Sequence, residues 1–391
     1  MKRVLKICAN TWDSASRDKR ELTLCRDLGA ETLVMAKGAP GDSFRKEEVS
    51  GFHVYRFSTR PLGTARWLTP LNQILSLFVW GRKARKFRPD VITGHDLPGL
   101  FVGYLSNFGN PHKAALVYDS HEFEIGRAVR RSRLQIWLVT RLERFLMKRC
   151  AFSIMVNDSI AGEVQRIHRL KERPVVARNV PSYWELDPAE AARVRSGLLE
   201  KLGLPEGTFL TMYHGALMPE RGIENLLRAV SLTPGTAAVV LGNGNESYVS
   251  SLRALCRELG AADRVLFHPA VPVEALRNYA GAADVGTAII MGNTSKSYYL
   301  SLPNKFFETV QSLTPLIASD FPEMGKIIRD YNIGLTVNPE NTEDIAAAIR
   351  RMRDDREFYA ACKENLKRAK EELCWEREKT ALEEAYRRIL S

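Results

Sequence analysis

The chain lacks the features of secreted and membrane-spanning proteins. Its six cysteines are scattered singly, with no CxxC pair and no metal-ligand spacing, so we expect reduced thiols in a cytoplasmic protein. The N-terminus has a broken apolar run, which is typical of a first strand and not of a signal peptide. The longest apolar stretch, around 74–80, is far below the roughly 18 residues that span a bilayer. We therefore expect neither export nor a spanning helix.

Several binding motifs are also missing. Leu241-Gly242-Asn243-Gly244 is a glycine turn after an apolar run, but it is not a GxGxxG fingerprint, which argues against a dinucleotide site. No nucleic-acid-binding module is recognisable, and no internal repeat or low-complexity tract stands out. We expect no nucleic-acid partner.

The length and composition predict a globular protein of two domains. A chain of 391 residues exceeds the roughly 250–300 residues at which single hydrophobic cores stop growing. Apolar residues make up 45% and charged residues 26%, which is the balance of a folded protein.

The positive charge belongs to one half of the chain. Residues 1–180 contain 32 Lys or Arg and 17 Asp or Glu, and the remainder contains 25 and 29. The basic residues concentrate in 82–88 and 127–149, among large apolar residues. Those neighbours are Trp67, Leu77, Phe78, Trp80, Trp137, Leu138, Phe145 and Leu146. This mixture predicts contact with an anionic membrane surface, on the inner face of the cell membrane. A solvated helix face, whose arginines cover apolar neighbours, is the alternative.

Short apolar runs alternate with helical periodicity through both halves, which predicts an α/β fold with doubly wound parallel sheets. In the first half, the expected strands are 4–9, 31–36, 53–57, 91–93, 115–118, 152–156 and 175–177. In the second half, they are 209–213, 237–241, 265–268, 284–290, 315–319 and 334–337.

The composition shifts after Asn179-Val180-Pro181, so we place a linker near 182–206. We expect an N-terminal domain over 1–185, a C-terminal domain over 186–370 and a terminal segment over 371–391. Residues 356–390 are charged and helically periodic, which predicts one or two long helices.

Polar residues follow several expected strands of the first half: Asn10, His95-Asp96, Asp119 to Glu122, and Asn157-Asp158. Ligands of open α/β sheets bind at the carboxyl ends of the strands, so we expect these residues to line a cleft.

The segment Leu302 to Glu308 predicts a loop followed by the first turn of a helix. Asn304 can cap that helix, and the free backbone amides of the first helical turn would face an anion such as a diphosphate. Lys305 adds a cation, and Glu308, three residues later on the same face, can accept hydrogen bonds from a ribose. A buried turn, with Phe306 and Phe307 in the core and Lys305 paired to Glu308, is the alternative.

The segment Tyr213 to Glu224 predicts a strand, a tight loop and a helix start. Gly215 permits close approach of the backbone to a ligand, and Arg221 offers a planar fork for phosphate oxygens. A capped helix with a surface arginine explains the same pattern.

The order of these motifs resembles the family-4 retaining glycosyltransferases over nearly the whole chain. The motifs are HDLPGL, VYDSHEF, NVP, YHGALMPERGIENLLRAV, LGNG, ADVGTAI, SLPNKFFETVQSLTPLIASDFPEM and CWEREKTALEEAYRRIL. The resemblance implies the GT-B fold: two Rossmann-like domains facing a cleft, with the C-terminal helix crossing back to the N-terminal domain.

The resemblance also implies roles for particular residues. His121, Arg221 and Lys305 would be catalytic, with Arg221 and Lys305 neutralising the departing diphosphate. The donor would also contact Gly215, Asn243, Leu300, Ser301, Leu302, Asn304 and Glu308. The acceptor side would include Asp13, His95, Asp119 and Glu122. No metal would be needed, because Arg221 and Lys305 neutralise the diphosphate, and no cofactor would be needed, because the nucleotide sugar is itself a substrate.

Two positions depart from the family pattern. Many members carry a glutamate eight residues before the one at Glu308, and here Leu300 stands there. Many also carry an arginine directly after Gly215, and here Ala216 stands there.

The implied activity is transfer of a sugar, with retention, from a nucleotide-diphosphate donor to an acceptor hydroxyl. The basic, aromatic first half favours a lipid-linked or polysaccharide acceptor. A nucleotide-sugar 2-epimerase and a non-catalytic sugar-nucleotide-binding subunit are the alternatives.

Overall fold

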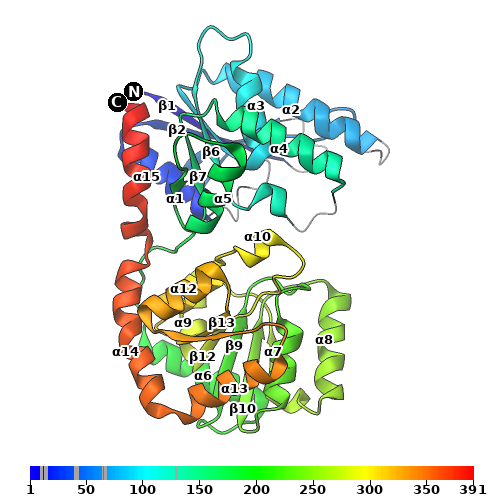
Figure 1. The fold of residues 1–391 in the computed structure, drawn as a ribbon, viewed down its shortest axis with the longest axis vertical. Coiled ribbons are helices and arrows are strands. Elements are labelled where there is room, and N and C mark those ends of the chain that lie inside the picture. Colours follow the sequence, from blue (N-terminus) through cyan, green and yellow to red (C-terminus); the bar gives the residue numbers. More distant parts are fainter. Residues whose placement is uncertain (9–11, 13–15, 39–43, 64, 66–67, 128–130) are drawn as a thin grey trace. The chain divides into compact units, whose positions relative to one another are not determined.

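The computed structural model describes residues 1–8, 12, 16–38, 44–63, 65, 68–127 and 131–391. These residues form two compact units (Figure 1). The first comprises Met1–Arg178 and Lys379–Ser391, and the second comprises Asn179–Glu378. Each unit is described by itself below.

The first unit is built on an eight-stranded sheet in the order β3-β4-β2-β1-β5-β6-β7-β8. All neighbouring pairs are parallel except β3 and β4. The strands are β1 (Arg3–Cys8), β2 (Glu31–Lys37), β3 (Phe44–Val49), β4 (Phe52–Phe57), β5 (Val91–His95), β6 (Ala115–Asp119), β7 (Phe152–Met155) and β8 (Val175–Val176). The parallel register places Cys8 beside His95 and His95 beside Asp119, so the carboxyl ends of β1, β5 and β6 are level.

Helices connect these strands in the usual order of a doubly wound fold. They are α1 (Ser16–Asp27), α2 (Thr69–Lys86), α3 (Asp96–Asn107), η2 (Glu124–Gly126), α4 (Arg133–Met147) and α5 (Asp158–His168). The end of α15 (Trp375–Leu390) also belongs to this unit, where the buried Tyr386 hydroxyl contacts Thr93 Oγ1 at 2.8 Å.

The second unit has a six-stranded parallel sheet in the order β11-β10-β9-β12-β13-β14. Its strands are β9 (Phe209–His214), β10 (Thr236–Leu241), β11 (Val265–His268), β12 (Val285–Ala288), β13 (Leu316–Ser319) and β14 (Gly334–Val337). Every residue of β10, β12 and β13 is buried, as expected of strands covered on both faces.

Helices cover the second sheet as well, and two apolar cores lie between helices and strands. The helices are α6 (Pro188–Leu202), α7 (Ile223–Ser231), α8 (Glu246–Glu258), η3 (Ala262–Arg264), α9 (Val273–Ala282), α10 (Lys296–Tyr299), α11 (Asn304–Gln311), α12 (Pro322–Tyr331), α13 (Thr342–Asp354) and α14 (Arg356–Glu372).

The predicted fold class is confirmed: both units are Rossmann-like, with parallel sheets between helices. The prediction missed β3, which pairs antiparallel with β4 at the edge of the first sheet. Its sequence, FRKEEV, is mostly charged, as edge strands often are, so no apolar run marks it.

The predicted linker over 182–206 is wrong, because α6 (Pro188–Leu202) lies inside it. Asp187 caps this helix by accepting hydrogen bonds from the amides of Ala189 and Glu190. Pro188 follows, and Gly203 ends the helix in the left-handed conformation. The chain divides between 178 and 179, not between 185 and 186, and α14 and α15 form the two terminal helices. Among the described residues, no helix combines the length and apolar character needed to span a bilayer.

Candidate active site

A pocket of about 540 Å³ opens at the carboxyl ends of β9 and β10 in the second unit. It brings together two predicted segments that are far apart in the sequence, 213–224 and 302–308. Its lining consists of Tyr213, His214, Gly215, Ala216, Arg221, Leu241, Gly242, Asn243, Ala270, Val271, Leu276, Pro303, Asn304, Lys305 and Glu308. The predicted donor residues Gly215, Arg221, Asn243, Asn304, Lys305 and Glu308 therefore share one pocket.

Lys305 is a buried cation, and no carboxylate of the described residues hydrogen-bonds its ammonium group. The side chains of Phe306 and Phe307, both fully buried, anchor α11 and fix the start of the helix. Lys305 Nζ lies 3.6 Å from the ring centroid of Tyr213 and has no hydrogen-bond partner among the described residues. Burial and the charge of Arg221 hold the pKa of Lys305 well below its usual value, although Glu308 opposes this shift. The pocket therefore offers an unsatisfied donor to an anion.

Arg221 is held by an unusual backbone. Glu220 and Gly222, on either side of it, both adopt left-handed conformations, with φ of 69° and 66°. The Glu220 carbonyl accepts a hydrogen bond from Met291 N at 3.0 Å, and the Arg221 guanidinium lies 5.3 Å from the centroid of Tyr298. A left-handed non-glycine residue costs free energy, so the surrounding contacts must fix this turn.

Two glycine turns meet at the floor of the pocket. A Cβ on Gly242 would lie 1.8 Å from the Gly215 carbonyl oxygen, so only glycine fits there. Gly215 has a φ of 126°, which also favours glycine. Both glycines line the pocket, and Gly215 is exposed there. Asn243 Oδ1 accepts a hydrogen bond from Ala270 N at 3.1 Å, which fixes the adjoining loop.

Glu308 is positioned by His214 and not by Lys305. His214 Nε2 lies 3.0 Å from Glu308 Oε2, and the histidine ring is buried at the end of β9. The alternative of a surface pair between Lys305 and Glu308 is therefore wrong. Asn304 is not the helix cap that the sequence predicted: Pro303 occupies that position, and Asn304 is the first helical residue. Its side chain lines the pocket instead.

Leu300, Ser301 and Leu302 lie outside the lining of this pocket. Leu300 and Leu302 are buried, and Ser301 Oγ donates a hydrogen bond to the Tyr298 carbonyl at 2.7 Å. These three residues thus stabilise the loop before α11 and do not line the pocket.

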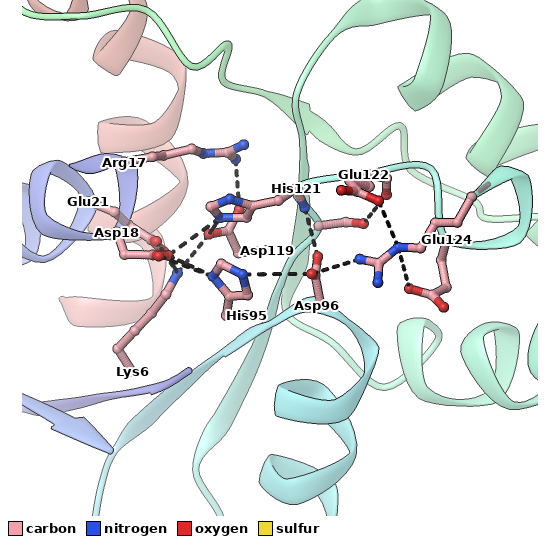
Figure 2. A network of polar contacts seen from close by, with 12 residues as sticks. Lys6, Arg17, Asp18, Glu21, His95, Asp96, Asp119, His121, Glu122 and Glu124 are labelled. Carbon is pink, nitrogen blue, oxygen red and sulfur yellow. Dashed lines mark hydrogen bonds and ion pairs between the residues drawn. The ribbon is translucent and has the colours of Figure 1, made fainter. Parts of the chain in front are cut away.

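Three predicted residues of the first unit, His95, Asp119 and His121, lie in a largely buried network of charges (Figure 2). At its centre is Lys6, which is fully buried on β1. Its ammonium group contacts Asp18 at 2.8 Å, Asp119 at 2.7 Å and the carboxylate of Glu21. Arg17 reaches the other oxygen of Asp119, also at 2.7 Å. Although burial opposes the charge, Asp119, Asp18 and Glu21 raise the pKa of Lys6 well above its usual value.

His121 lies against two of these carboxylates. Its Nε2 is 2.9 Å from Asp119 Oδ2 and 3.4 Å from Asp18 Oδ1. Burial lowers its pKa, but Asp119 and Asp18 outweigh burial and raise the pKa to about 9. With this pKa, His121 is a positively charged hydrogen-bond donor at neutral pH.

His95 stacks on His121, with ring centroids 4.0 Å apart, and its Nδ1 lies 3.1 Å from Asp18. Asp96 follows in a left-handed conformation, with a φ of 54°, and its Oδ1 accepts a hydrogen bond from the backbone N of His121 at 3.0 Å. Arg127 binds Asp96 at 2.7 Å and Glu122 at 3.1 Å. Figure 2 shows how these contacts link β5 to the loop after β6. The predicted acceptor residue Asp13 lies outside the described residues.

Four groups of this network could be considered for a metal ion. Asp18, His95, Asp119 and His121 each offer a ligand atom, and these atoms lie within 4.8 Å of one another. However, Lys6 and Arg17 already neutralise the two carboxylates, and both cations would repel a metal. The residues therefore fit an internal ion network better than a metal site, and metal-free chemistry stays a prediction.

The sequence reasoning missed Lys6, Arg17, Asp18 and Glu21 in the first unit, and Tyr213 and His214 as supports in the second. A signal for the first group was present. Lys6 interrupts the apolar run of β1, which is a central strand, so its side chain had to be buried and paired.

Comparison with known proteins decides the family. Residues 195–369, which contain the whole pocket, match the family model described as glycosyl transferases group 1. Residues 22–180 match the model of a glycosyl transferase 4-like domain. The chain belongs to the group 1 glycosyltransferases.

Individual relatives agree with this assignment. The glycosyltransferase is 25% identical to an uncharacterized glycosyltransferase of Methanocaldococcus jannaschii over 93% of each chain. It is 24% identical to the lipopolysaccharide core biosynthesis glycosyltransferase LpsD of Rhizobium meliloti, over 81% of this chain and 78% of that protein. Anabaena HepE, solved in complex with UDP-glucose, has the same fold, with a TM-score of 0.74 and 16% identity over 100% of this chain and 98% of that one.

Proposed function

We propose that this glycosyltransferase transfers a hexose, with retention, from a nucleotide-diphosphate sugar to an acceptor hydroxyl. The observation that carries the proposal is the buried ammonium group of Lys305, which faces the pocket beside Arg221 and lacks an anionic partner among the described residues. A dianionic diphosphate would satisfy both cations. The complex of Anabaena HepE with UDP-glucose supports a donor of this class.

The start of α11 adds to the attraction for a diphosphate. The first amides of a helix lack partners within it, and the helix dipole places partial positive charge there. Asn304 and Lys305 are the first two residues of α11 and both line the pocket. Together with Arg221, they would neutralise the charge that develops when the nucleotide leaves. Well-placed donors of this kind contribute roughly 3–4 kcal/mol each to catalysis.

Glu308 is assigned to the ribose. His214 holds one of its oxygens, Oε2, and thereby orients the carboxylate in the pocket. The other oxygen can then accept hydrogen bonds from the two ribose hydroxyls. Gly215 and Gly242 would let the nucleotide approach the backbone closely.

Retention, in a sequence with no obvious enzyme nucleophile, favours attack on the face from which the nucleotide leaves. The anomeric C–O bond breaks and its electron pair stays with the diphosphate. The acceptor oxygen then forms a bond to the anomeric carbon, and its proton passes to a phosphate oxygen. His121, protonated at neutral pH, is assigned the role of donating a hydrogen bond to the transferred sugar, and Asp119 fixes its orientation. No metal or other cofactor is required, because Lys305 and Arg221 supply the positive charge.

We assign the acceptor to a lipid-linked glycan or a growing polysaccharide, handled at the inner face of the cell membrane. The similarity to LpsD, whose name places it in lipopolysaccharide core synthesis, supports this assignment. His95 and Glu122, which belong to the same network as His121, are assigned to the acceptor side.

A non-catalytic sugar-nucleotide-binding subunit is the second candidate. Leu300, which is buried, replaces the glutamate of the family pattern, and Ala216 replaces the arginine. Such a subunit would bind nucleotide sugars without cleaving them, whereas a 2-epimerase would convert them without an acceptor.

Release of nucleoside diphosphate from a panel of UDP, GDP, ADP and dTDP sugars, without acceptor, tests these possibilities. We expect slow release from at least one donor, with loss of activity in Lys305→Ala and full activity in the exposed-lysine control Lys201→Ala. Binding without release would support the non-catalytic reading, and an epimerised sugar with no free nucleotide would support the epimerase.

A further inference from the structure

We propose that one outer face of the first unit docks on an anionic lipid bilayer. We call it the α2–α4 face, after the helices that border it. Its exposed apolar side chains include Ile74, Phe78, Leu134, Trp137, Leu138 and Phe145. Its exposed cations include Arg82, Lys83, Lys86, Arg133, Arg141 and Arg149. This inference does not depend on the proposed function, because no residue of the donor pocket takes part.

Helix α4 carries its more apolar side outward. Leu134 and Trp137 are 65% and 53% exposed, and Leu138 and Phe145 lie along the same side at helical spacing. The inward side is fixed by a polar residue: Glu143 is buried and accepts a hydrogen bond from the Tyr118 hydroxyl at 2.8 Å. His168 lies 3.0 Å from the same carboxylate. Turning the helix to bury its leucines would expose this pairing, so the outward apolar side is built into the fold.

Aromatic contacts across α3 make the α2–α4 face continuous. Phe78 of α2 packs edge-to-face on Phe101 of α3, with centroids 6.5 Å apart. One turn further along α3, Tyr104 packs in the same way on Phe145 of α4, at 5.4 Å. Figure 1 shows the three helices side by side in the upper part of the first unit, and α3 contacts both neighbours. The exposed apolar side chains of α2 and α4 therefore belong to one surface.

The charge of this face has one sign. The sequence of α2 has no acidic residue, and those of α3 and α4 each have one, Asp96 and Glu143, both buried. The charged residues at the C-terminal end of α2 and at both ends of α4 are all cations. A surface that combines apolar side chains with cations and no anions matches the boundary between acyl chains and anionic headgroups.

The arginines of α4 are placed as an interfacial helix requires. The Arg141 guanidinium lies 5.0 Å from the centroid of Trp137, and that of Arg149 lies 3.5 Å from the centroid of Phe145. Each cation covers an exposed ring, so the rings can enter the bilayer while the guanidinium groups reach the phosphates. A second copy of the chain fits less well, because a symmetric contact would bring these cations against their own counterparts.

The structure shows which of the apolar residues that the sequence predicted to contact a membrane are exposed. Trp80 and Leu146, which the sequence grouped with the basic residues, are buried and cannot touch a bilayer. Leu77 is only half-buried, and Trp67 lies outside the described residues. Phe78, Trp137, Leu138 and Phe145 remain on the exposed face.

Flotation with vesicles tests the proposal. Full-length protein should float with vesicles of mixed phosphatidylglycerol and phosphatidylcholine at low salt, and should stay in solution with phosphatidylcholine alone. The double variant Arg82→Glu/Lys83→Glu should bind the anionic vesicles about thirtyfold more weakly, since each basic residue lost near the surface weakens binding several-fold. Lys201→Glu/Arg228→Glu, the matched reversal of two exposed cations in the second unit, should bind like the wild type.

Insertion of Trp137 has its own signature. Brominated acyl chains should quench part of the tryptophan fluorescence of the wild type, and Trp137→Phe should lose this quenching while still floating, because the phenyl ring keeps the apolar contact. The proposal is overturned if the protein does not float with anionic vesicles. It is also overturned if the Arg82/Lys83 and Lys201/Arg228 reversals weaken binding equally, or if quenching persists in Trp137→Phe.

Discussion

The two units each bury a lysine at the carboxyl edge of their sheet or close to it, and the two lysines have opposite surroundings. Lys6 is enclosed by Asp18, Glu21 and Asp119, which raise its pKa. Lys305 rests on the ring of Tyr213, and burial together with Arg221 lowers its pKa. One charge is neutralised within the protein, and the other is not.

This difference separates scaffold from binding site. A self-neutralised network gains nothing from a further ion, but it fixes the positions of His95 and His121. An uncompensated cation destabilises the folded protein until an anion arrives, and it gains the most from that anion. The buried charges of the first unit thus fix the positions of side chains, whereas the buried charge of the second unit is available to bind a ligand.

The largest expected effect is that of Lys6→Met on the first unit. The substitution leaves three buried carboxylates without their common cation, and breaking a buried pair in this way costs roughly 3–5 kcal/mol. Hydrogen exchange of the β1, β5 and β6 amides should quicken accordingly, while the second unit is unchanged. Lys171→Met, which removes an exposed lysine of the same unit, is the control. Equal protection in wild type and Lys6→Met would refute the role of the network.

The next effect is the pH dependence that His121 confers. Its pKa rises from 6.5 to about 9 on folding, so the folded state binds more protons between these values. The stability from His121 is fully present below about pH 6.5 and is lost as the pH rises through about 9. The loss is on the order of 3 kcal/mol. Urea unfolding measures the free energy of unfolding across this pH range. That free energy should fall less steeply with pH in His121→Gln than in the wild type. An equal slope in the two proteins would contradict the raised pKa of His121.

Lys305→Met should change stability in the direction opposite to Lys6→Met. Removing a buried charge without a hydrogen-bond partner should stabilise the second unit by roughly 1–3 kcal/mol. The same variant should bind nucleoside diphosphates about tenfold to a hundredfold more weakly, because charge-assisted hydrogen bonds are lost. Thermal unfolding with and without nucleotide measures both changes. A destabilised variant would mean that Lys305 has a structural partner.

The smallest expected effect is that of Tyr386→Phe. The hydroxyl links α15 to Thr93 at 2.8 Å and to the carboxylate of Glu21. Its loss should cost about 1–2 kcal/mol and loosen the terminal helix. Limited proteolysis near the C-terminus measures this loosening, with Tyr299→Phe, on an exposed ring, as the control. Identical cleavage rates in the two variants would show that the hydroxyl does not tie α15 to the network.

The sequence predicted the architecture well because strand and helix periods differ strongly in a doubly wound fold. It failed at β3, whose charged residues follow no apolar pattern, and at α6, whose start in a polar stretch was interpreted as a linker. Both elements lie where the apolar periodicity of the sequence is weak. The structure shows β3 through its pairing with β4, and it shows the start of α6 through the Asp187 cap.

The sequence predicted some residues of the candidate site but not the residues that position them. Motif order led to Arg221, Lys305 and Glu308, which the structure gathers in one pocket. The partners of these residues were not predictable, because contacts such as His214 with Glu308 join segments far apart in the chain. The family resemblance places Leu300, Ser301 and Leu302 at the donor, whereas the structure buries the side chains of Leu300 and Leu302 and leaves all three residues out of the pocket lining.

Calorimetric titration of UDP and other nucleoside diphosphates into the wild type and Lys305→Met shows whether Lys305 is an uncompensated cation that binds the donor diphosphate. In buffers of different ionisation enthalpy, at neutral to mildly alkaline pH, the wild type should take up protons on binding, because the diphosphate raises the lowered pKa of Lys305. The variant should bind more weakly and without this uptake. Equal affinity and equal proton exchange in the two proteins, or no binding of any nucleoside diphosphate, would contradict the account.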